Sequence, residues 1–203
     1  MSENMMKPTK VITGKVRCSY AYLLEPRPGN KPDDKPKYSV SLIIPKDDKT
    51  TIDRIKKAIA AAIDEGEAKL GLPPKGDPKR KLAIQNLTLP LRDGDTDRFE
   101  HEEYANAMFT NANSVRKPGI IDQNKRPLTE PEDVYSGMYA RVSLNFYAYA
   151  VQGKKGIAAG LGNVQKWADG ERLGGGGMSA DAEFDVLELD EVEDGDTAYE
   201  DLL

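Results

Sequence analysis

Two stretches near the start of the chain alternate between apolar and polar residues. In residues 37–45 (KYSVSLIIP) every second side chain from Tyr38 to Ile44 is apolar, which is the period of a strand with one buried face. Residues 10–24 are rich in β-branched and aromatic residues, and four of them share one parity: Val16, Cys18, Tyr20 and Tyr22. We therefore predict two strands, the first with these four side chains buried, joined as a hairpin by the proline-rich loop 25–36.

The hydrophobic period becomes that of a helix after residue 50. Isoleucines stand at positions 52, 55, 59 and 63, which puts them on one stripe of a helix facing the core. Thr50 and Asp53 fit a capping box at its start, while Gly71 fits its end and Pro73–Pro74 prevent its continuation. The pattern predicts one helix over about residues 51–70, packed on the core.

The second half of the chain favours strands. We expect a basic loop at 73–82, a short strand at most near 84–89, and further strands at 108–121, 134–151 and 156–167, the last two joined by a turn at 152–155. A mainly antiparallel chain with one helix inserted fits a small Greek-key barrel such as the OB-fold better than an α/β sheet. The predicted fold class is therefore mainly β, an OB-fold-like barrel with one inserted α-helix and long loops.

The strand at 138–151 presents two different faces. Its inward positions are Val142, Leu144, Phe146, Ala148 and Ala150, and its outward positions are Tyr139, Arg141, Ser143, Asn145, Tyr147 and Tyr149. Bases of single-stranded nucleic acid stack on exposed rings for roughly 1–3 kcal/mol each, and Arg or Lys neutralises phosphates. We predict that the three tyrosines stack on bases and that Arg141 contacts phosphate. Packing of the same tyrosines under a neighbouring loop stays open as the alternative.

Basic residues elsewhere extend this predicted site. The candidates for phosphate contacts are Lys154 and Lys155 in the turn, Arg116 and Lys117, Arg17, and Lys37. Trp167, near the end of the last strand, either stacks on a base or closes the end of the barrel.

Charge divides the chain into two parts. The sequence has 29 basic and 34 acidic residues, yet residues 178–203 contain eleven of the acids and no Lys or Arg. A segment with this composition cannot bury enough apolar surface to offset its ordering entropy, so we expect it to stay disordered. We divide the chain into a binding domain at 1–173 and a glycine linker with an acidic tail at 174–203.

The tail suggests competition and recruitment. Tethered to a cationic body, a flexible polyanion samples basic surface at high effective concentration and competes with any external polyanion. Apolar residues among the acids suit a recognition motif for other proteins, and the tail candidates are Phe184, Tyr199, Leu202 and Leu203. A purely solubilising tail and a scaffold that acts only through the tail are the alternatives.

Catalytic and cofactor chemistry finds little support. Cys18 and His101 are the sole residues of their types, which argues against disulfides, zinc clusters and a Ser-His-Asp triad. Asp93, Asp95 and Asp97 resemble the start of a calcium loop, but Arg98 and Tyr104 stand where a glycine and a glutamate are needed. A Mg²⁺-dependent nuclease using the acids from Asp93 to Glu103 is the main enzymatic alternative. We expect a non-enzyme without cofactor or metal, lacking membrane segments.

Residues 135–175 (YSGMYARVSLNFYAYAVQGKKGIAAGLGNVQKWADGERLGG) resemble the single-stranded DNA-binding proteins of tailed bacteriophages, a group long filed as a phage domain of unknown function. The resemblance runs from Lys15 to about Gly177. It implies an OB-fold, non-sequence-specific binding of single-stranded DNA in replication, recombination and repair, and an acidic tail that competes with DNA and contacts phage or host replication proteins. The host cytoplasm is the expected location, and a homodimer is left open.

Overall fold

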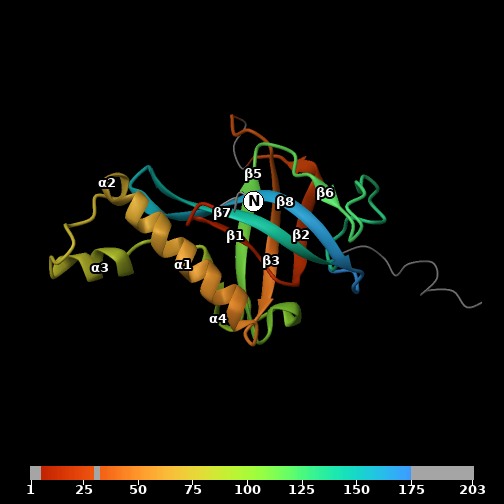
Figure 1. The fold of residues 1–203 in the computed structure, drawn as a ribbon, viewed down its shortest axis with the longest axis horizontal. Coiled ribbons are helices and arrows are strands. Elements are labelled where there is room, and N and C mark those ends of the chain that lie inside the picture. Colours follow the sequence, from red (N-terminus) through yellow and green to blue (C-terminus); the bar gives the residue numbers. More distant parts are fainter. Residues whose placement is uncertain (1–5, 30–32, 175–203) are drawn as a thin grey trace, which may run out of the picture.

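Five long strands close a barrel in the computed structural model, which describes residues 6–29 and 33–174 (Figure 1). The strands are β2 (Val16–Arg27), β3 (Lys37–Pro45), β5 (Ala107–Ser114), β7 (Tyr139–Val151) and β8 (Lys154–Ala168). Each pairs antiparallel with the next around the barrel, except that β5 and β8 pair in parallel. This order and closure are those of an OB-fold, as predicted.

Three shorter strands extend the sheet. β1 (Lys10–Ile12) pairs with β7 along the same edge that β2 uses, β4 (Leu91–Asp93) pairs with β5, and β6 (Ile120–Ile121) pairs with β8. Residues 10–24 therefore form two strands rather than one, and residues 108–121 likewise divide between β5 and β6. Short edge strands of this kind leave little unpaired backbone exposed.

The alternation of β7 is confirmed over most of its length. Val142, Leu144 and Phe146 are buried inside the barrel, whereas Arg141, Asn145 and Tyr147 face outward. Ala150 departs from the prediction and is exposed because β7 and β8 continue beyond the core as a hairpin. Its turn is Gln152–Gly153, both with positive φ (50° and 78°), the backbone that suits the twist of a two-residue hairpin.

The predicted helix is present but divided. α1 (Lys49–Glu65) buries the isoleucine stripe against the core, and α2 (Glu67–Leu70) follows after Gly66. The predicted capping box is wrong: Asp48 is the N-cap, and its carboxylate accepts from the Thr51 amide at 3.0 Å. Gly71 ends α2 in the left-handed region at φ 64°, as a C-terminal glycine should.

More helix forms than the single one expected. α3 (Lys79–Gln85) replaces the end of the predicted basic loop and the first two positions of the short strand expected near 84–89, of which Thr88 alone forms a bridge. α4 (Gly94–Asp97) and the 3₁₀ turn η1 (Glu102–Tyr104) follow before β5. These pieces lack a sustained apolar period because they pack through one or two side chains each, so periodicity did not reveal them.

A bulge in β2 overturns part of the predicted burial. Val16 and Cys18 are fully buried, but Tyr20 and Tyr22 are 45% and 42% exposed. The register between β2 and β3 shifts between Ser19 and Tyr22, and Tyr20 takes a positive φ of 47°. One extra residue reverses which parity faces inward, so Leu23 is buried instead.

The core lies inside the barrel and beneath α1. It joins the inward side chains of β2, β3, β7 and β8 to the helix stripe. Cys18 belongs to this core, where burial raises the pKa of its thiol to about 12. None of the helices in the described ranges has the length and apolar character needed to cross a bilayer. The predictions for residues 175–203 lie outside the described residues.

Candidate nucleic-acid interface

The outer surface of β2, β3 and β5 forms a hollow of about 350 Å³. We call it the strand hollow; it is lined by Tyr20, Tyr22, Arg27, Ser39, Val40, Ser41, Arg98, Asn111, Ala112 and Asn113. Its floor follows from strand pairing, because Ser41 lies opposite Asn111 and Ser39 lies opposite Asn113. Small polar side chains at paired positions keep the floor low and give it hydrogen-bonding groups.

Aromatic rings and guanidinium groups stand together around this floor. The Arg98 guanidinium carbon lies 5.7 Å from the centre of the Tyr20 ring, and that of Arg27 lies 5.9 Å from the Tyr22 ring. Both distances are within the range of a cation–π contact. The hollow therefore combines flat apolar surfaces with positive charge, and Phe99, 76% exposed, follows Arg98 along the chain.

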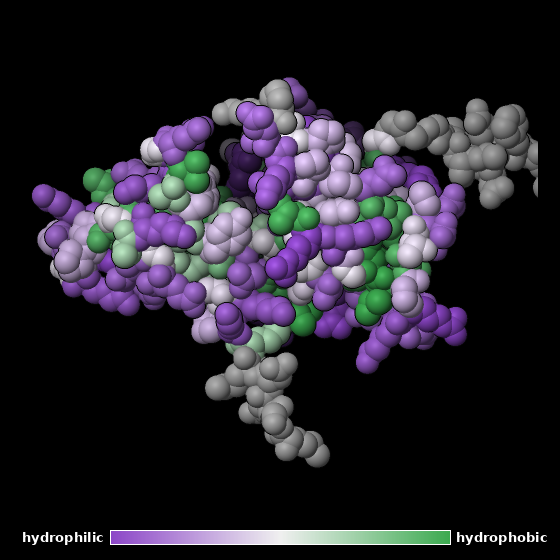
Figure 2. Space-filling model, turned by 90° about the horizontal axis from the view of Figure 1, so that it is seen from above, coloured by the Kyte–Doolittle hydropathy of each residue, from purple (hydrophilic) through white to green (hydrophobic). Residues whose placement is uncertain are grey.

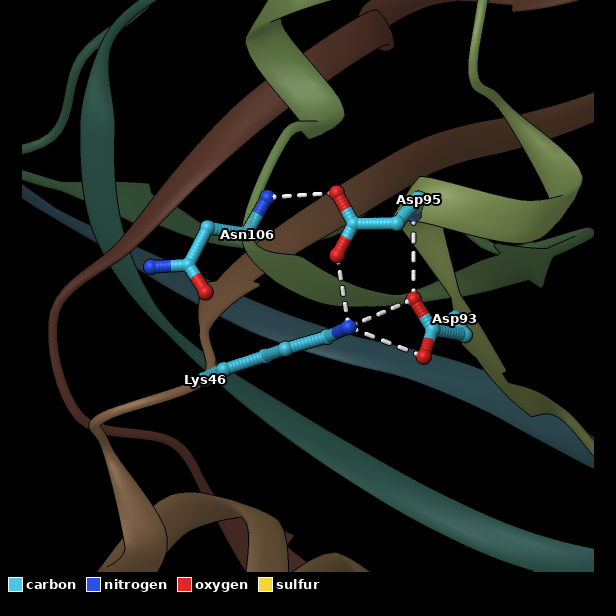
Figure 3. A network of polar contacts seen from close by, with 4 residues as sticks. All are labelled: Lys46, Asp93, Asp95 and Asn106. Carbon is cyan, nitrogen blue, oxygen red and sulfur yellow. Dashed lines mark hydrogen bonds and ion pairs between the residues drawn. The ribbon is translucent and has the colours of Figure 1, made fainter.

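Arg98 owes its position to a polar latch at the start of α4 (Figure 3). The Lys46 ammonium lies 2.8 Å from Asp93 and 2.6 Å from Asp95, and Asp95 also accepts from the Asn106 amide at 2.8 Å. The hydrogen bond from Lys46 lowers the pKa of the Asp95 carboxyl, and the two acids raise the pKa of Lys46. The latch ties the β4–α4 segment, which directly precedes Arg98, to Lys46 at the end of β3.

A buried tyrosine fixes the segment that follows. The Tyr104 hydroxyl donates to the Ser41 hydroxyl at 2.9 Å, and its ring meets Phe109 edge to face at 5.2 Å between centres. Gly94 has to be glycine here, because a Cβ on it would lie 2.3 Å from the Tyr104 carbonyl oxygen. Residues 94–104 therefore cover one end of the outer surface and leave the strand hollow open beside them.

Residues after β8 pack against the same end of the outer surface that residues 94–104 cover. The Arg17 guanidinium donates to the Glu171 carbonyl at 2.9 Å, and the Leu173 amide donates to the Ser136 carbonyl at 2.8 Å. Leu173 packs on the cluster of Ile43, Tyr104, Ala107 and Phe109. We call residues 169–173 the C-terminal strap; it places Gly174 beside the elements that carry Arg98.

Tyr135 anchors the strap at its start. Its hydroxyl donates to Asp169 at 2.7 Å, and the Arg172 guanidinium lies 4.2 Å from its ring centre. Partial burial and the neighbouring carboxylate raise the pKa of Tyr135. The hydrogen bond from Lys166 lowers the pKa of Asp169, so the Asp169 carboxylate stays ionised and the Tyr135 hydroxyl stays neutral around pH 7.

The structure brings a few of the sequence-predicted residues close to the strand hollow. Arg17 and Tyr139 are strand partners at the covered end, where the Lys15 ammonium lies 4.5 Å from the Tyr139 ring centre. These three line a pocket of about 410 Å³ next to Ile43. Lys37 lines a further recess that shares Arg27, Ser39 and Asn113 with the strand hollow.

The remaining predicted aromatic residues are spread along the barrel. Tyr149 pairs with Gly156 at the far end of β7, ten positions from Tyr139, or roughly 33 Å along an extended strand. Tyr147 is 44% exposed between these ends, and Arg141 lines a shallow pocket beside β1. Trp167 is 45% exposed near the end of β8, where its carbonyl accepts from Gln123.

The predicted basic residues likewise occupy separate places. Lys155 donates to the Leu70 carbonyl at 2.8 Å and so holds the end of α2, whereas Lys154 is exposed in the hairpin. Arg116 and Lys117 are exposed in the loop after β5. Seen from above in Figure 2, hydrophobic residues form small groups among hydrophilic ones.

The three aspartates among the acids proposed for a nuclease are held in ion pairs. Asp93 and Asp95 contact Lys46, and Asp97 contacts Arg92 at 2.7 Å. Within residues 6–29 and 33–174, no three Asp, Glu, His or Cys side chains are placed to hold a metal ion. The three aspartates help to position α4. Arg98 stands where a calcium loop needs a glycine, and it lines the strand hollow.

Comparison with known proteins places these features in a family. The family described as the single-stranded DNA-binding protein of Enterobacter phage Enc34 matches residues 9–197. The chain belongs to this family. It is also similar to protein p50 of Acyrthosiphon pisum secondary endosymbiont phage 1, with 32% identity over 186 residues, 91% of this chain and 97% of the relative. The Enc34 family consists of DNA-binding proteins, not enzymes, and the predicted resemblance is confirmed.

Solved structures agree on the fold. The Enc34 single-stranded DNA-binding protein in complex with single-stranded DNA is 26% identical, with a TM-score of 0.65 over 83% of this chain and 91% of that chain. A second similar structure is the single-stranded DNA-binding protein gp2.5 of bacteriophage T7. It is 17% identical, with a TM-score of 0.53 over 82% of this chain and 95% of that chain, and it supports the fold alone.

Sequence reasoning missed the principal residues of the strand hollow: Tyr20, Tyr22, Arg27 and Arg98. The two tyrosines were assigned to the core by parity, and the bulge that turns them outward has no signature that periodicity detects. The spacing of two tyrosines next to a long proline-rich loop was the available signal, since loops positioned by a barrel commonly carry binding residues.

Proposed function

We propose that this phage protein binds single-stranded DNA without sequence preference through the strand hollow, and that it acts in DNA replication, recombination and repair. The main support is a pair of cation–π contacts, Arg98 with Tyr20 and Arg27 with Tyr22. Both contacts lie over a floor of serine and asparagine side chains. The Enc34 relative that is solved with single-stranded DNA has this fold. Its identity of 26% supports the same ligand here.

Each part of the hollow has a chemical role in this proposal. Stacking on Tyr20 and Tyr22 is expected to contribute roughly 1–3 kcal/mol per base, and it favours no sequence because every base has a flat face. Arg27 and Arg98 neutralise phosphates, joined by Lys37 in the adjoining recess. The floor amides and hydroxyls bond to sugar or base edges.

The sequence-predicted residues extend the path. We propose that Arg17 and Tyr139 meet the strand beyond the segment that covers the hollow's end. The predicted roles of Arg141, Tyr147, Tyr149, Trp167, Lys154, Lys155, Arg116 and Lys117 stay predictions. They require a DNA strand that leaves the hollow and passes along the barrel.

The acidic tail is proposed to compete with DNA for the hollow. The strap ends at Leu173, which packs on the cluster of Ile43, Tyr104, Ala107 and Phe109. The Tyr104 and Phe109 rings each have their centre 5.5 Å from the Arg98 guanidinium carbon. A tail attached there reaches the hollow at high effective concentration. DNA would release it, exposing Phe184, Tyr199, Leu202 and Leu203 to phage or host replication proteins in the cytoplasm.

Titration with a short deoxythymidine oligomer at several salt concentrations tests this proposal, using the full chain and a chain ending at Gly177. Neutralising three or four phosphates predicts a log–log salt slope of about −2 to −3, with tighter binding by the shortened chain. If neither chain binds the oligomer, the proposal fails and the alternative of a scaffold that acts only through its tail is favoured. A flat salt response would exclude the proposed phosphate contacts.

A further inference from the structure

The short helix α3 carries a basic and apolar face that lies outside the DNA site. On its inner side the Arg80 guanidinium donates to the Pro73 carbonyl at 2.7 Å and pairs with Glu67, while Ile84 packs on the core. On its outer side Leu82 is 61% exposed. The ammonium groups of Lys79 and Lys81 have no ion-pair partner among the described residues.

The tip of the β7–β8 hairpin lies at the same end of the molecule. The Lys155 ammonium reaches the end of α2 at Leu70, and the Thr88 amide, just after α3, donates to the Lys155 carbonyl at 3.1 Å. This end therefore also presents Lys154 and the 60% exposed Val151. We call Lys79, Lys81, Leu82, Val151 and Lys154 the α3 patch.

The α3 patch is remote from the strand hollow. Figure 1 shows α3 at one end of the long axis, with β2, β3 and the end of β8 toward the other. Three lysines beside two exposed aliphatic side chains suit an acidic peptide with apolar residues among its charges. The α3 patch is therefore a second basic region. It differs from the strand hollow because none of its residues has an aromatic ring on which a base could stack.

This chain contains a segment of that composition. Residues 181–203 have eleven carboxylates and no basic residue, with apolar side chains including Phe184, Val186, Leu187 and Leu189. We propose that the α3 patch of one molecule binds the acidic C-terminal segment of a neighbouring copy on the same DNA strand. The lysines pair with the carboxylates, and the apolar residues cover Leu82 and Val151.

The placement of the strap suits a contact between neighbouring molecules. The strap holds the start of the tail beside the covered end of the hollow, whereas the patch is at the opposite end of the long axis (Figure 1). A contact between two unlike surfaces repeats from copy to copy and forms an open row. This inference rests on the proposed function: DNA that displaces the tail from the hollow makes it available to the next molecule.

A peptide titration tests the patch directly. A fluorescent peptide of residues 178–203 is added to the full chain whose hollow is saturated with a short deoxythymidine oligomer. We expect Lys79→Glu with Lys81→Glu to weaken the peptide complex about tenfold, because two exposed attractions become repulsions. The matched control, Lys56→Glu with Lys57→Glu on exposed positions of α1, is expected to change it less than about twofold.

The same titration separates the outcomes. If both double variants lose the same affinity for the peptide, the loss reflects net charge and the proposal is overturned. Much tighter peptide binding by a chain ending at Gly177 than by the full chain would show that each tail covers its own patch. Failure of the oligomer to bind would contradict the proposed function itself.

A mixture of variants tests the contact between copies. On a long single strand, we expect cooperative binding by the full chain and its loss both in the Lys79→Glu/Lys81→Glu variant and in the chain ending at Gly177. Mixing these two partners restores tail-to-patch contacts between unlike neighbours, so cooperativity should partly return. Independent binding by the full chain, or no recovery in the mixture, would overturn the proposal.

Discussion

The strand hollow and the outward face of β7 both expose tyrosine near arginine, but their shapes differ. In the hollow, strand pairing and a bulge bring Tyr20, Tyr22 and two guanidinium groups around a common floor. On β7 the tyrosines follow one another along a strand, with Tyr139 and Tyr149 at opposite ends. Exposed rings alone therefore do not make a site; a second and third strand must supply a surface against which a base can be held.

The first prediction is that an outward side chain of β7 contributes little to the stability of the barrel, whereas an inward one contributes much. Phe146→Ala, inside the barrel, should lower the free energy of unfolding by about 3–5 kcal/mol through cavity formation. Tyr147→Ala, one position away and exposed, should change it by about 0.5 kcal/mol or less. Urea unfolding of both variants measures the difference. Similar losses would mean that Tyr147 is a packing residue.

Removing one ring from each surface sharpens the comparison in binding. Tyr22→Ala should weaken oligomer binding by roughly 1–3 kcal/mol, the value of one stacked base. Tyr147→Ala should weaken binding of a short oligomer by less than about 0.5 kcal/mol, because the strand in the hollow does not extend to it. Fluorescence titration with matched oligomers gives both values. The reverse order would move the site to β7.

The two arginines should differ in their salt response. Arg98→Gln removes one proposed phosphate contact, so the log–log slope should become about 0.7 less negative. Arg141→Gln should leave the slope for a short oligomer unchanged, since Arg141 lies beside β1. Titrations of both variants over a range of salt concentrations make the comparison. Equal changes would indicate a general charge effect, not a specific contact.

A smaller effect is expected at the latch behind Arg98. Asp95→Asn removes one of the two carboxylates that hold Lys46, so binding should weaken a few-fold through misplacement of Arg98. Because the pKa of Asp95 is lowered, the latch is intact above the ordinary Asp pKa of about 3.9 and is lost as pH falls through the lowered value. The ratio of wild-type to variant affinity should therefore be constant between pH 5 and 8. An unchanged affinity in Asp95→Asn would mean that Arg98 does not depend on the latch.

Much of the fold could be predicted because its strands are long and regular. β3 matches its predicted bounds, and the inward residues of β7 follow from strict alternation. The short helices α3 and α4 could not be predicted in this way because each is held by particular contacts, such as Arg80 with Glu67 and Lys46 with Asp95. Tertiary contacts override weak local preference in such segments.

The strand hollow proposed from the structure differs from the predicted site on β7, whose residues stay predictions. Aromatic and basic residues outside a barrel indicated a single-strand binder, yet parity assigned Tyr20 and Tyr22 to the core. A one-residue bulge at Ser19–Tyr22 exchanged inside and outside, and sequence alternation cannot locate such an insertion. Arg98 was seen only as a defect in an acidic motif, because its role depends on Tyr20 and Tyr104 from distant parts of the chain.

Photo-cross-linking tests most directly whether DNA lies in the strand hollow. A short single strand containing iodouracil is irradiated with the full chain, and the attached residues are identified by peptide mass mapping. The account predicts attachment at Tyr20 or Tyr22, since stacked rings are the nearest reactive groups. Attachment confined to Tyr147 and Tyr149, with Tyr20 and Tyr22 unmodified, would contradict it and return the site to the outward face of β7.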